Sequence, residues 1–202
     1  LLYMIAHVLY RNRKFAESLH YVEQLGEAIE EYNKSHFNLF FTRYVLLLAQ
    51  LKSYQGQNPI SVELLEGFLN SHGHLSSSDN LNGHLNLSVY YFQQEDYKMA
   101  NKTLLGIHHT DKWCEKKMGK EWVLKKNLIE MIIQYEMGND DIAVNRIRSI
   151  ERYFADMFTL PQYTRVKNFL TFIKAFINDP IGVSDPAFIK KAEKALIVND
   201  HE

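Results

Sequence analysis

The chain has 202 residues, of which 46% are hydrophobic and 13% aromatic, which is enough for a packed core and too apolar for a disordered chain. Lysine and arginine number 23 against 24 acidic residues, so the net charge of −1 gives no general attraction to nucleic acid or to an anionic membrane. The single cysteine excludes an internal disulfide framework, and no apolar run reaches the ~18 residues that would span a bilayer.

Apolar residues at helical spacing predict helices with short polar turns along the whole chain. In the first half we expect helices over Leu1–Arg11, Phe15–Tyr32, His36–Tyr54 and Ser61–Asn70, the third capped by Ser35. We expect a polar loop over His72–Asn82. Two helices joined by the turn Gln94-Glu95-Asp96 then follow and end near His109.

The second half begins with Asp111–Lys126, where six lysines accompany Trp113 and Trp122, and we expect a solvated connection there. The helix after it runs to Met137, turns at Gly138 and returns as Ile142–Phe158. Pro161 predicts a break before a helix over Tyr163–Asn178. Asp185 is expected to cap a last helix, Pro186–Val198, with its proline in the first turn.

One pattern recurs four times along the chain. Small residues stand at intervals of 43, 39 and 43 residues, as Ser18, Ser61, Ala100 and Ala143. Twelve residues before each stand Ala6, Ala49, Ser88 and Met131, and the turn between them falls at Arg13, Gly56, Glu95 and Gly138. Aliphatic or aromatic residues follow each small residue by four and by seven positions, as Val22 and Leu25, Leu65 and Phe68, Leu104 and Ile107, Ile147 and Ile150. This register predicts repeated helical hairpins, with small residues where two helices cross.

Over roughly Leu1 to Asp156 the chain resembles the tetratricopeptide-repeat (TPR) family. It departs from the family because the repeats exceed ~34 residues, because no proline follows the second helix, and because no tryptophan opens a first helix. The resemblance implies an all-α, TPR-like, right-handed superhelix of about five antiparallel helix pairs with long helices. We expect one domain over 1–202, with pairs at about 1–33, 36–71, 80–109, 119–158 and 162–198. The fifth pair is out of register and is read as a closing cap.

In the TPR family the first helix of each pair lines a concave groove. The resemblance therefore implies a groove for a protein or peptide, formed by Tyr3, His7, Tyr10, Arg11, Gln50, Tyr54, Asn82, Val89, Phe92, Gln93, Tyr135 and Glu136. Aromatic and arginine side chains are the usual anchors of interfaces. The alternative is plain packing between repeats, above all for the matching Leu128 and Ile132.

Three other groups of residues give only weak support for zinc binding, catalysis or nucleic-acid binding. The histidines His72, His74, His84, His108 and His109, with Cys114 nearby, form no recognised zinc motif and are better explained as solvated loop residues. Nothing places His108 and His109 with Cys114 in a catalytic pocket. The lysines and tryptophans of 111–126 could bind nucleic acid, but Asp111, Glu115 and Glu121 are interleaved with them.

We therefore expect a cytoplasmic interaction module or scaffold that needs no cofactor or metal and is not an enzyme, with a homo-oligomer left open. No nucleic acid or membrane is expected to bind this segment. The alternative is an effector-sensing or regulatory domain of a larger protein, such as a bacterial transcriptional regulator. The apolar, uncapped helix at Leu1 suggests a fragment of a longer chain, in which a DNA-binding part would precede Leu1.

Overall fold

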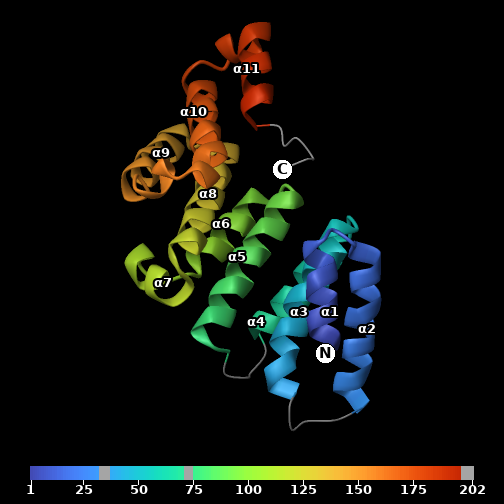
Figure 1. Ribbon diagram of the computed structural model, residues 1–202. Coiled ribbons are helices and arrows are strands. Elements are labelled where there is room, and N and C mark those ends of the chain that lie inside the picture. Colours follow the sequence, from blue (N-terminus) through green and yellow to red (C-terminus); the bar gives the residue numbers. More distant parts are fainter. Residues whose placement is uncertain (32–36, 71–74, 197–202) are drawn as a thin grey trace. The chain divides into compact units, whose positions relative to one another are not determined.

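A computed structural model describes residues 1–31, 37–70 and 75–196 of the chain, and these residues contain eleven α-helices, three short 3₁₀ helices and no strand (Figure 1). The prediction of an all-α protein is confirmed. The chain divides into two compact units, Leu1–Met118 and Gly119–Glu202, and each is described here by itself.

The first unit holds three helical hairpins and one short additional helix. Their bounds are α1 Leu2–Arg11, α2 Phe15–Glu31, α3 Phe37–Tyr54, α4 Asn58–Asn70, α5 Ser77–Gln93, α6 Tyr97–Leu105 and α7 Asp111–Met118. The pairs α1 with α2, α3 with α4, and α5 with α6 pack side by side (Figure 1). Each hairpin also packs on the next, because α2 contacts α3 and α4 contacts α5. The predicted pairing of neighbouring helices is confirmed for this unit.

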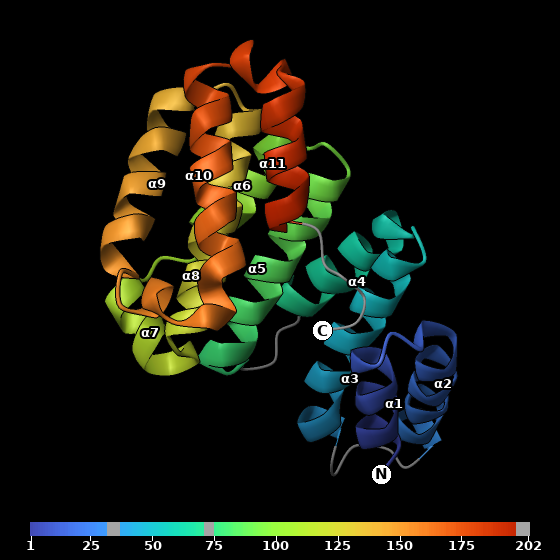
Figure 2. The ribbon, with the colours of Figure 1, turned by 45° about the horizontal axis from the view of Figure 1, so that its top comes forward.

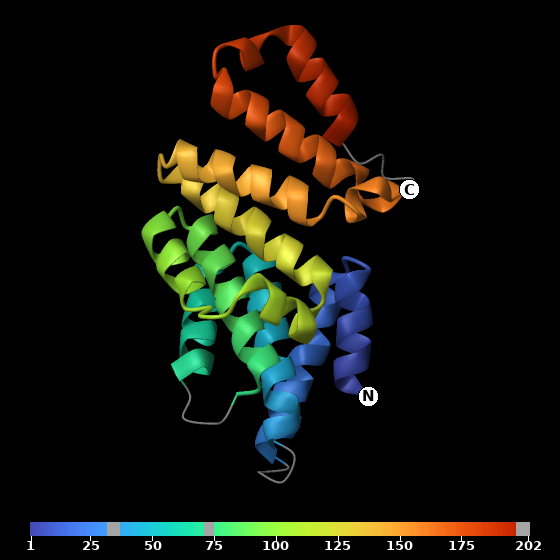
Figure 3. The same ribbon diagram turned by 90° about the vertical axis from the view of Figure 1, so that its left-hand side faces the viewer.

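The second unit continues the pairing. Its elements are α8 Lys120–Glu136, α9 Asp140–Tyr153, the 3₁₀ turns Met157–Thr159 and Pro161–Tyr163, α10 Thr164–Asn178, the 3₁₀ turn Gly182–Ser184 and α11 Pro186–Leu196. The helices α8 and α9 lie antiparallel (Figure 3), and α10 packs on both α9 and α11 (Figure 2). The predicted break at Pro161 and the last helix are both present. Asp185 caps that helix as expected, since its Oδ1 accepts the backbone N–H of Ala187 at 3.0 Å.

The four repeated turns have one backbone geometry. The residues predicted for the turn, Arg13, Gly56, Glu95 and Gly138, all have positive φ, between 60° and 75°. In each turn the residue after the positive-φ residue donates its N–H to the carbonyl five residues earlier, as from Lys14 to Leu9 (3.0 Å) and from Asp96 to Tyr91 (3.0 Å). This is the Schellman hydrogen bond that ends a helix on a left-handed residue. The same following residue accepts the N–H of the small crossing residue four positions later, as Lys14 does from Ser18 (2.9 Å), and so begins the second helix.

The predicted helix crossings are equally regular. All eight small or crossing residues are fully buried, from Ala6 and Ser18 in the first hairpin to Met131 and Ala143 in the fourth. In three hairpins a serine hydroxyl spans the crossing and donates to a backbone carbonyl twelve positions away. The pairs are Ser18 to Ala6 (2.7 Å), Ser61 to Ala49 (2.8 Å) and Ser88 to Ala100 (2.9 Å). A buried hydroxyl thus finds a partner because two helix backbones approach closely, which only small residues allow.

Two predicted connections are wrong in extent. The loop expected over His72–Asn82 gives way to α5 at Ser77, because Ser76 caps this helix: its Oγ accepts the N–H of Asp79 at 3.1 Å and donates to that carboxylate at 2.7 Å. The fourth helix likewise begins at Asn58 instead of Ser61, with Pro59 in its first turn. The predicted cap Ser35 and the start at His36 lie outside the described residues, as do His72 and His74.

The region 111–126 is helical and not a solvated connection. Residues 111–118 form α7, and residues 120–126 are the first turns of α8. Gly119, with a φ of +86°, separates the two helices. Trp122 and Lys126 are buried at 9% exposure. The Lys126 ammonium lies 3.4 Å from Glu130, and Arg146 of α9 pairs with the same carboxylate and donates to Asn127 at 3.1 Å. Lys126 can therefore be buried because a carboxylate next to it offsets its loss of hydration.

Candidate functional site

The first helices of the three hairpins in the first unit contact one another in sequence, α1 with α3 and α3 with α5. Among the described residues the second helices α2, α4 and α6 make no such contacts with each other. Two side-chain contacts join neighbouring first helices: Arg43 of α3 lies over the ring of Tyr3, 5.6 Å from its centroid, and Ser53 donates to Gln93 at 2.9 Å. The predicted groove residues of this unit therefore belong to three helices that lie next to each other.

Three aromatic rings meet at the turn end of α1 and α3. The rings of Phe15 and Tyr54 are stacked with centroids 4.2 Å apart, and Tyr10 meets Tyr54 edge-on at 5.7 Å and Phe15 at 5.9 Å. Tyr54 is 60% exposed, although rings of this size are usually covered. The pKa of Tyr10 is raised well above its ordinary value, mainly by burial and to a smaller extent by a hydrogen bond with Tyr54. Tyr54 is therefore stacked on a neighbouring ring and yet remains largely exposed.

The other predicted groove residues have different surroundings. In the first unit, His7 stacks on Tyr3 with centroids 5.7 Å apart, and Phe92 packs on Tyr97 of the same hairpin at 5.4 Å. Arg11 and Gln93 are exposed, whereas Gln50, Asn82 and Val89 are half-buried. Tyr135 and Glu136 end α8 in the second unit, where Tyr135 meets Phe176 of α10 edge-on at 5.8 Å.

Phe15 of the aromatic cluster and Tyr90 near it were not predicted to be part of the groove. Phe15 opens α2 and was assigned to the apolar face of that helix, but it stacks on the exposed Tyr54 of the next hairpin. Tyr90 of α5 is 5% exposed, and the nearby Tyr10 and Tyr54 add to the effect of burial in raising its pKa. The signal in the sequence was the unusual density of aromatic residues beside the turns, at Tyr10, Phe15 and Tyr54.

Charge is segregated between first and second helices in the first two hairpins. The helices α1 and α3 contain Arg11, Arg43 and Lys52 but no acidic residue. The helices α2 and α4 contain no lysine or arginine, and their glutamates are Glu17, Glu23, Glu27, Glu30, Glu31, Glu63 and Glu66. The predicted groove side of these hairpins is therefore aromatic and cationic, whereas the other helix of each pair is acidic.

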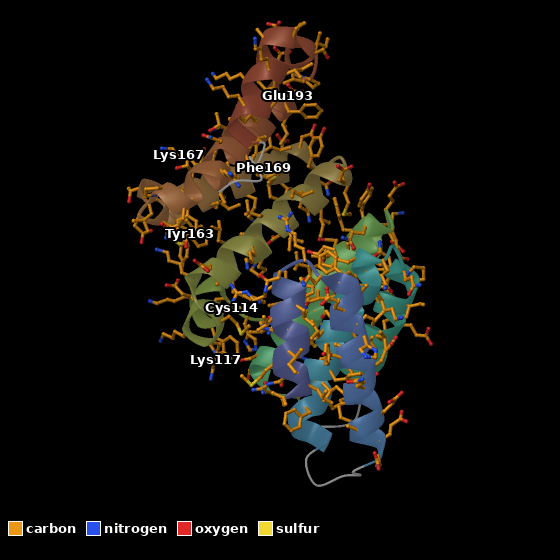
Figure 4. All side chains as sticks on the ribbon, turned by 45° about the vertical axis from the view of Figure 1, so that its right-hand side comes forward. Cys114, Lys117, Tyr163, Lys167, Phe169 and Glu193 are labelled. Carbon is orange, nitrogen blue, oxygen red and sulfur yellow. The ribbon has the colours of Figure 1, made fainter. Side chains whose placement is uncertain are left out.

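Of the residues considered for catalysis, Cys114 is buried, whereas His108 and His109 are exposed. Cys114 is fully buried in α7, and its Sγ lies 4.0 Å from the backbone oxygen of His109 (Figure 4). His109 is exposed and stacks on Trp113 with centroids 3.6 Å apart, while Lys117 lies over the same ring at 5.7 Å. Within the described part of the chain, no group of three or more His, Cys, Asp or Glu residues is arranged to hold a metal ion.

A hollow of about 350 Å³ lies in the second unit between the end of α9, the turn after it and α10. It is lined by Glu151, Ala155, Phe158, Thr159, Lys167, Leu170 and Thr171, and Figure 4 shows Lys167 on α10. Lys174 pairs with Glu151 at 3.4 Å. The lining combines an apolar floor with one ammonium and one carboxylate, and its volume falls in the range of small-molecule sites.

No protein-family model matches this chain, and no curated protein or solved structure matches it either. None of the described helices is long and apolar enough to cross a membrane.

Proposed function

We propose that the protein is a protein-binding or peptide-binding scaffold whose binding surface is formed by the first helices of its hairpins. The exposed, stacked ring of Tyr54 is the observation that carries this proposal. A large aromatic side chain that is already held in one orientation loses little conformational entropy when a partner covers it. The neighbouring Tyr10, Arg11 and Gln93 add the mixture of aromatic and polar groups that interface centres contain.

A TPR-like superhelix is the arrangement proposed for the hairpins. Two observations support it in the first unit: its three in-register turns share one geometry, and the first helices of successive hairpins contact one another whereas, among the described residues, the second helices do not. Hairpins whose first helices are closer together than their second helices must curve, with the first helices on the inside. We expect small-angle scattering to show an elongated, curved particle, whereas a compact sphere would contradict the superhelix.

The binding proposal is tested by capture from native cell extract with the intact protein, followed by affinity measurements with each captured partner. The variant Tyr54→Ala with Phe92→Ala should weaken binding by at least ~2 kcal/mol, about thirtyfold, as loss of a true anchor does. Leu105→Ala on α6 is the matched control, because Leu105 is an exposed apolar residue outside the first helices. A variant with unchanged circular dichroism and undiminished affinity would show that this surface is not the binding site.

The second candidate is an effector-sensing domain, and the hollow between α9 and α10 favours it. A small molecule with one anionic and one cationic group would pair with Lys167 and Glu151 over the apolar floor. Screening such zwitterionic compounds by thermal shift tests the idea. Lys167→Gln should abolish the stabilisation caused by a genuine ligand, whereas Lys190→Gln on the exposed face of α11 should not.

A further inference from the structure

Each hairpin of the first unit has one pair of side chains that meet across its turn. The pair joins the residue three positions before the positive-φ residue to the residue two positions after it. In the first and third hairpins the pair is aromatic, with ring centroids 5.9 Å and 5.4 Å apart, and in the second it is a hydrogen bond of 2.8 Å. The pairs are Tyr10 with Phe15, Ser53 with Asn58, and Phe92 with Tyr97.

Two more side chains connect these pairs across the hairpins. Tyr54 of α3 stacks on Phe15 with centroids 4.2 Å apart and is 60% exposed. Gln93 of α5 is exposed and hydrogen-bonds to Ser53 at 2.9 Å. Tyr54 belongs to the middle hairpin, which has a neighbouring hairpin on each side, so its exposure does not depend on where the chain begins.

These eight residues form what we call the turn-end strip, and none of them is charged, although 23% of the chain is. Aromatic rings lie at both ends of the strip, and hydroxyl and amide groups lie between them. The members are Tyr10, Phe15, Ser53, Tyr54, Asn58, Phe92, Gln93 and Tyr97.

The middle of the strip presents unused amide groups. The Ser53 hydroxyl lies 2.8 Å from the amide of Asn58 and 2.9 Å from that of Gln93. A side-chain amide has a donor end and an acceptor end, and each of these amides uses only one end on the hydroxyl. Among the described residues neither amide has another hydrogen-bond partner. Two amide ends therefore lie between aromatic rings, where they can bind the backbone of another chain.

This alternation of rings and amides suits an extended backbone better than a helix. A helix satisfies its own backbone groups, so it would present nothing to the amides between the rings. A polyproline II segment has no internal hydrogen bonds, and its prolines have carbonyl acceptors but no N–H. Its exposed carbonyl groups match the amide donors of the strip.

The spacing of the rings also fits a polyproline II segment. Such a segment repeats every three residues, over about 9 Å. The helix α3 packs on α5, and packed helices lie about 8–10 Å apart. Two prolines separated by two residues can therefore cover Tyr54 on α3 and Phe92 on α5, with a carbonyl between them near Gln93.

We infer that the turn-end strip binds a proline-rich segment of a partner protein in the polyproline II conformation. The inference rests on the proposed function, since it names the class of partner for the surface around Tyr54. Proline rings pack on the aromatic rings, and the carbonyl groups between them accept hydrogen bonds from Asn58 and Gln93. A segment that is already extended loses little conformational entropy on binding.

The probe is a labelled, end-blocked peptide in which Ala-Pro-Pro is repeated four times. The matched control peptide has serine in place of every proline, which keeps the length and removes the preference for polyproline II. Fluorescence anisotropy with the intact protein should show saturable binding of the proline peptide, with a Kd below roughly 1 mM. The serine peptide should bind at least tenfold more weakly.

Variants with unchanged circular dichroism then locate the binding. Tyr54→Ala should weaken binding of the proline peptide at least tenfold, whereas Tyr54→Phe should keep most of the affinity because the ring remains. Gln93→Ala should weaken binding several-fold through loss of a hydrogen bond. Gln94→Ala is its control, because Gln94 is a neighbouring exposed glutamine outside the strip.

Equal affinity for the two peptides, no saturable binding of the proline peptide, or no loss in Tyr54→Ala would overturn the inference. Partners captured from cell extract separate this failure from that of the proposed function. If they lose affinity for Tyr54→Ala with Phe92→Ala while the proline peptide does not bind, the surface is correct and the proline-rich partner is wrong. If they also keep their affinity, both proposals fail.

Discussion

At the scale of single residues, the four turns depend on one left-handed position each. Glycine occupies it at Gly56 and Gly138, but Arg13 and Glu95 occupy it at φ values of 60° and 62°. A side chain with a Cβ is strained there, because the Cβ approaches the following carbonyl oxygen. The turns at Arg13 and Glu95 are therefore less stable than the same turns would be with glycine at this position.

We expect Arg13→Gly and Glu95→Gly each to raise the free energy of unfolding by roughly 0.5–1 kcal/mol. Gly56→Ala and Gly138→Ala should lower it by a similar amount or more, since they introduce the same strain. Urea denaturation followed by circular dichroism measures all four. A lower urea midpoint for both Arg13→Gly and Glu95→Gly would contradict the role given to these positions.

The buried tyrosines make stability sensitive to alkaline pH. Burial, and then the hydrogen bond to Glu66, raise the pKa of Tyr91 from 10.0 to about 12. Between about pH 10 and pH 12 the unfolded chain loses this proton while the folded chain keeps it, so stability is complete below pH 10 and falls as pH rises through the window. Tyr44 and Tyr90 shift in the same direction.

Glu66→Gln should bring the pKa of Tyr91 closer to its ordinary value, because it removes the negative charge next to the phenol. Ultraviolet titration of tyrosinate absorbance checks this, with Tyr91→Phe identifying the signal of Tyr91. Glu63→Gln on the same helix is the control. An identical titration curve for Glu66→Gln and the unchanged protein would show that this carboxylate does not act on Tyr91.

At the scale of helices, three of the four repeated hairpins have a small, fully buried residue on both helices where they cross. Ala100 is fully buried, and its carbonyl accepts the Ser88 hydroxyl across the crossing. Ala100→Phe should force α5 and α6 apart and cost about 1–3 kcal/mol or more. Lys116→Phe, at an exposed position of α7, should cost far less. Thermal unfolding compares the two, and equal destabilisation would show that Ala100 does not lie at a tight crossing.

At the scale of the whole molecule, the first unit contains three hairpins and the aromatic cluster around Tyr54. We expect residues 1–118 expressed alone to fold, with a helix-rich circular dichroism spectrum and one cooperative urea transition, because each hairpin packs mainly on its neighbours. They should also bind partners captured through Tyr54. An unfolded fragment would show that the first unit needs residues 119–202 for its stability.

The sequence by itself determined the helices, the turns and the register of the hairpins. Ser18, Ser61, Ala100 and Ala143 could be aligned because the close approach of two helix backbones leaves room for few residue types. The turn residues were found for a similar reason, since a chain reversal between two helices has few geometries. The starts of α4 and α5 were predicted too late, because the residues before them, Gln57 and Ser76, stand among other polar residues that look the same in sequence.

Only the tertiary structure decided which exposed side chains matter. Tyr54 and Phe15 are 39 residues apart, and no helical periodicity relates two rings on different hairpins that stack at 4.2 Å. Lys126 was predicted to be solvated: its i,i+4 spacing to Glu130 can be read from the sequence, but its burial and the pairing of Arg146 of α9 with the same carboxylate cannot. Met4 and Leu47 occupy the same place in the repeat, but one is exposed and the other is buried. Periodicity gives each residue its side of a helix, whereas burial depends on which neighbouring helix covers that side, and that is fixed by contacts between distant parts of the chain.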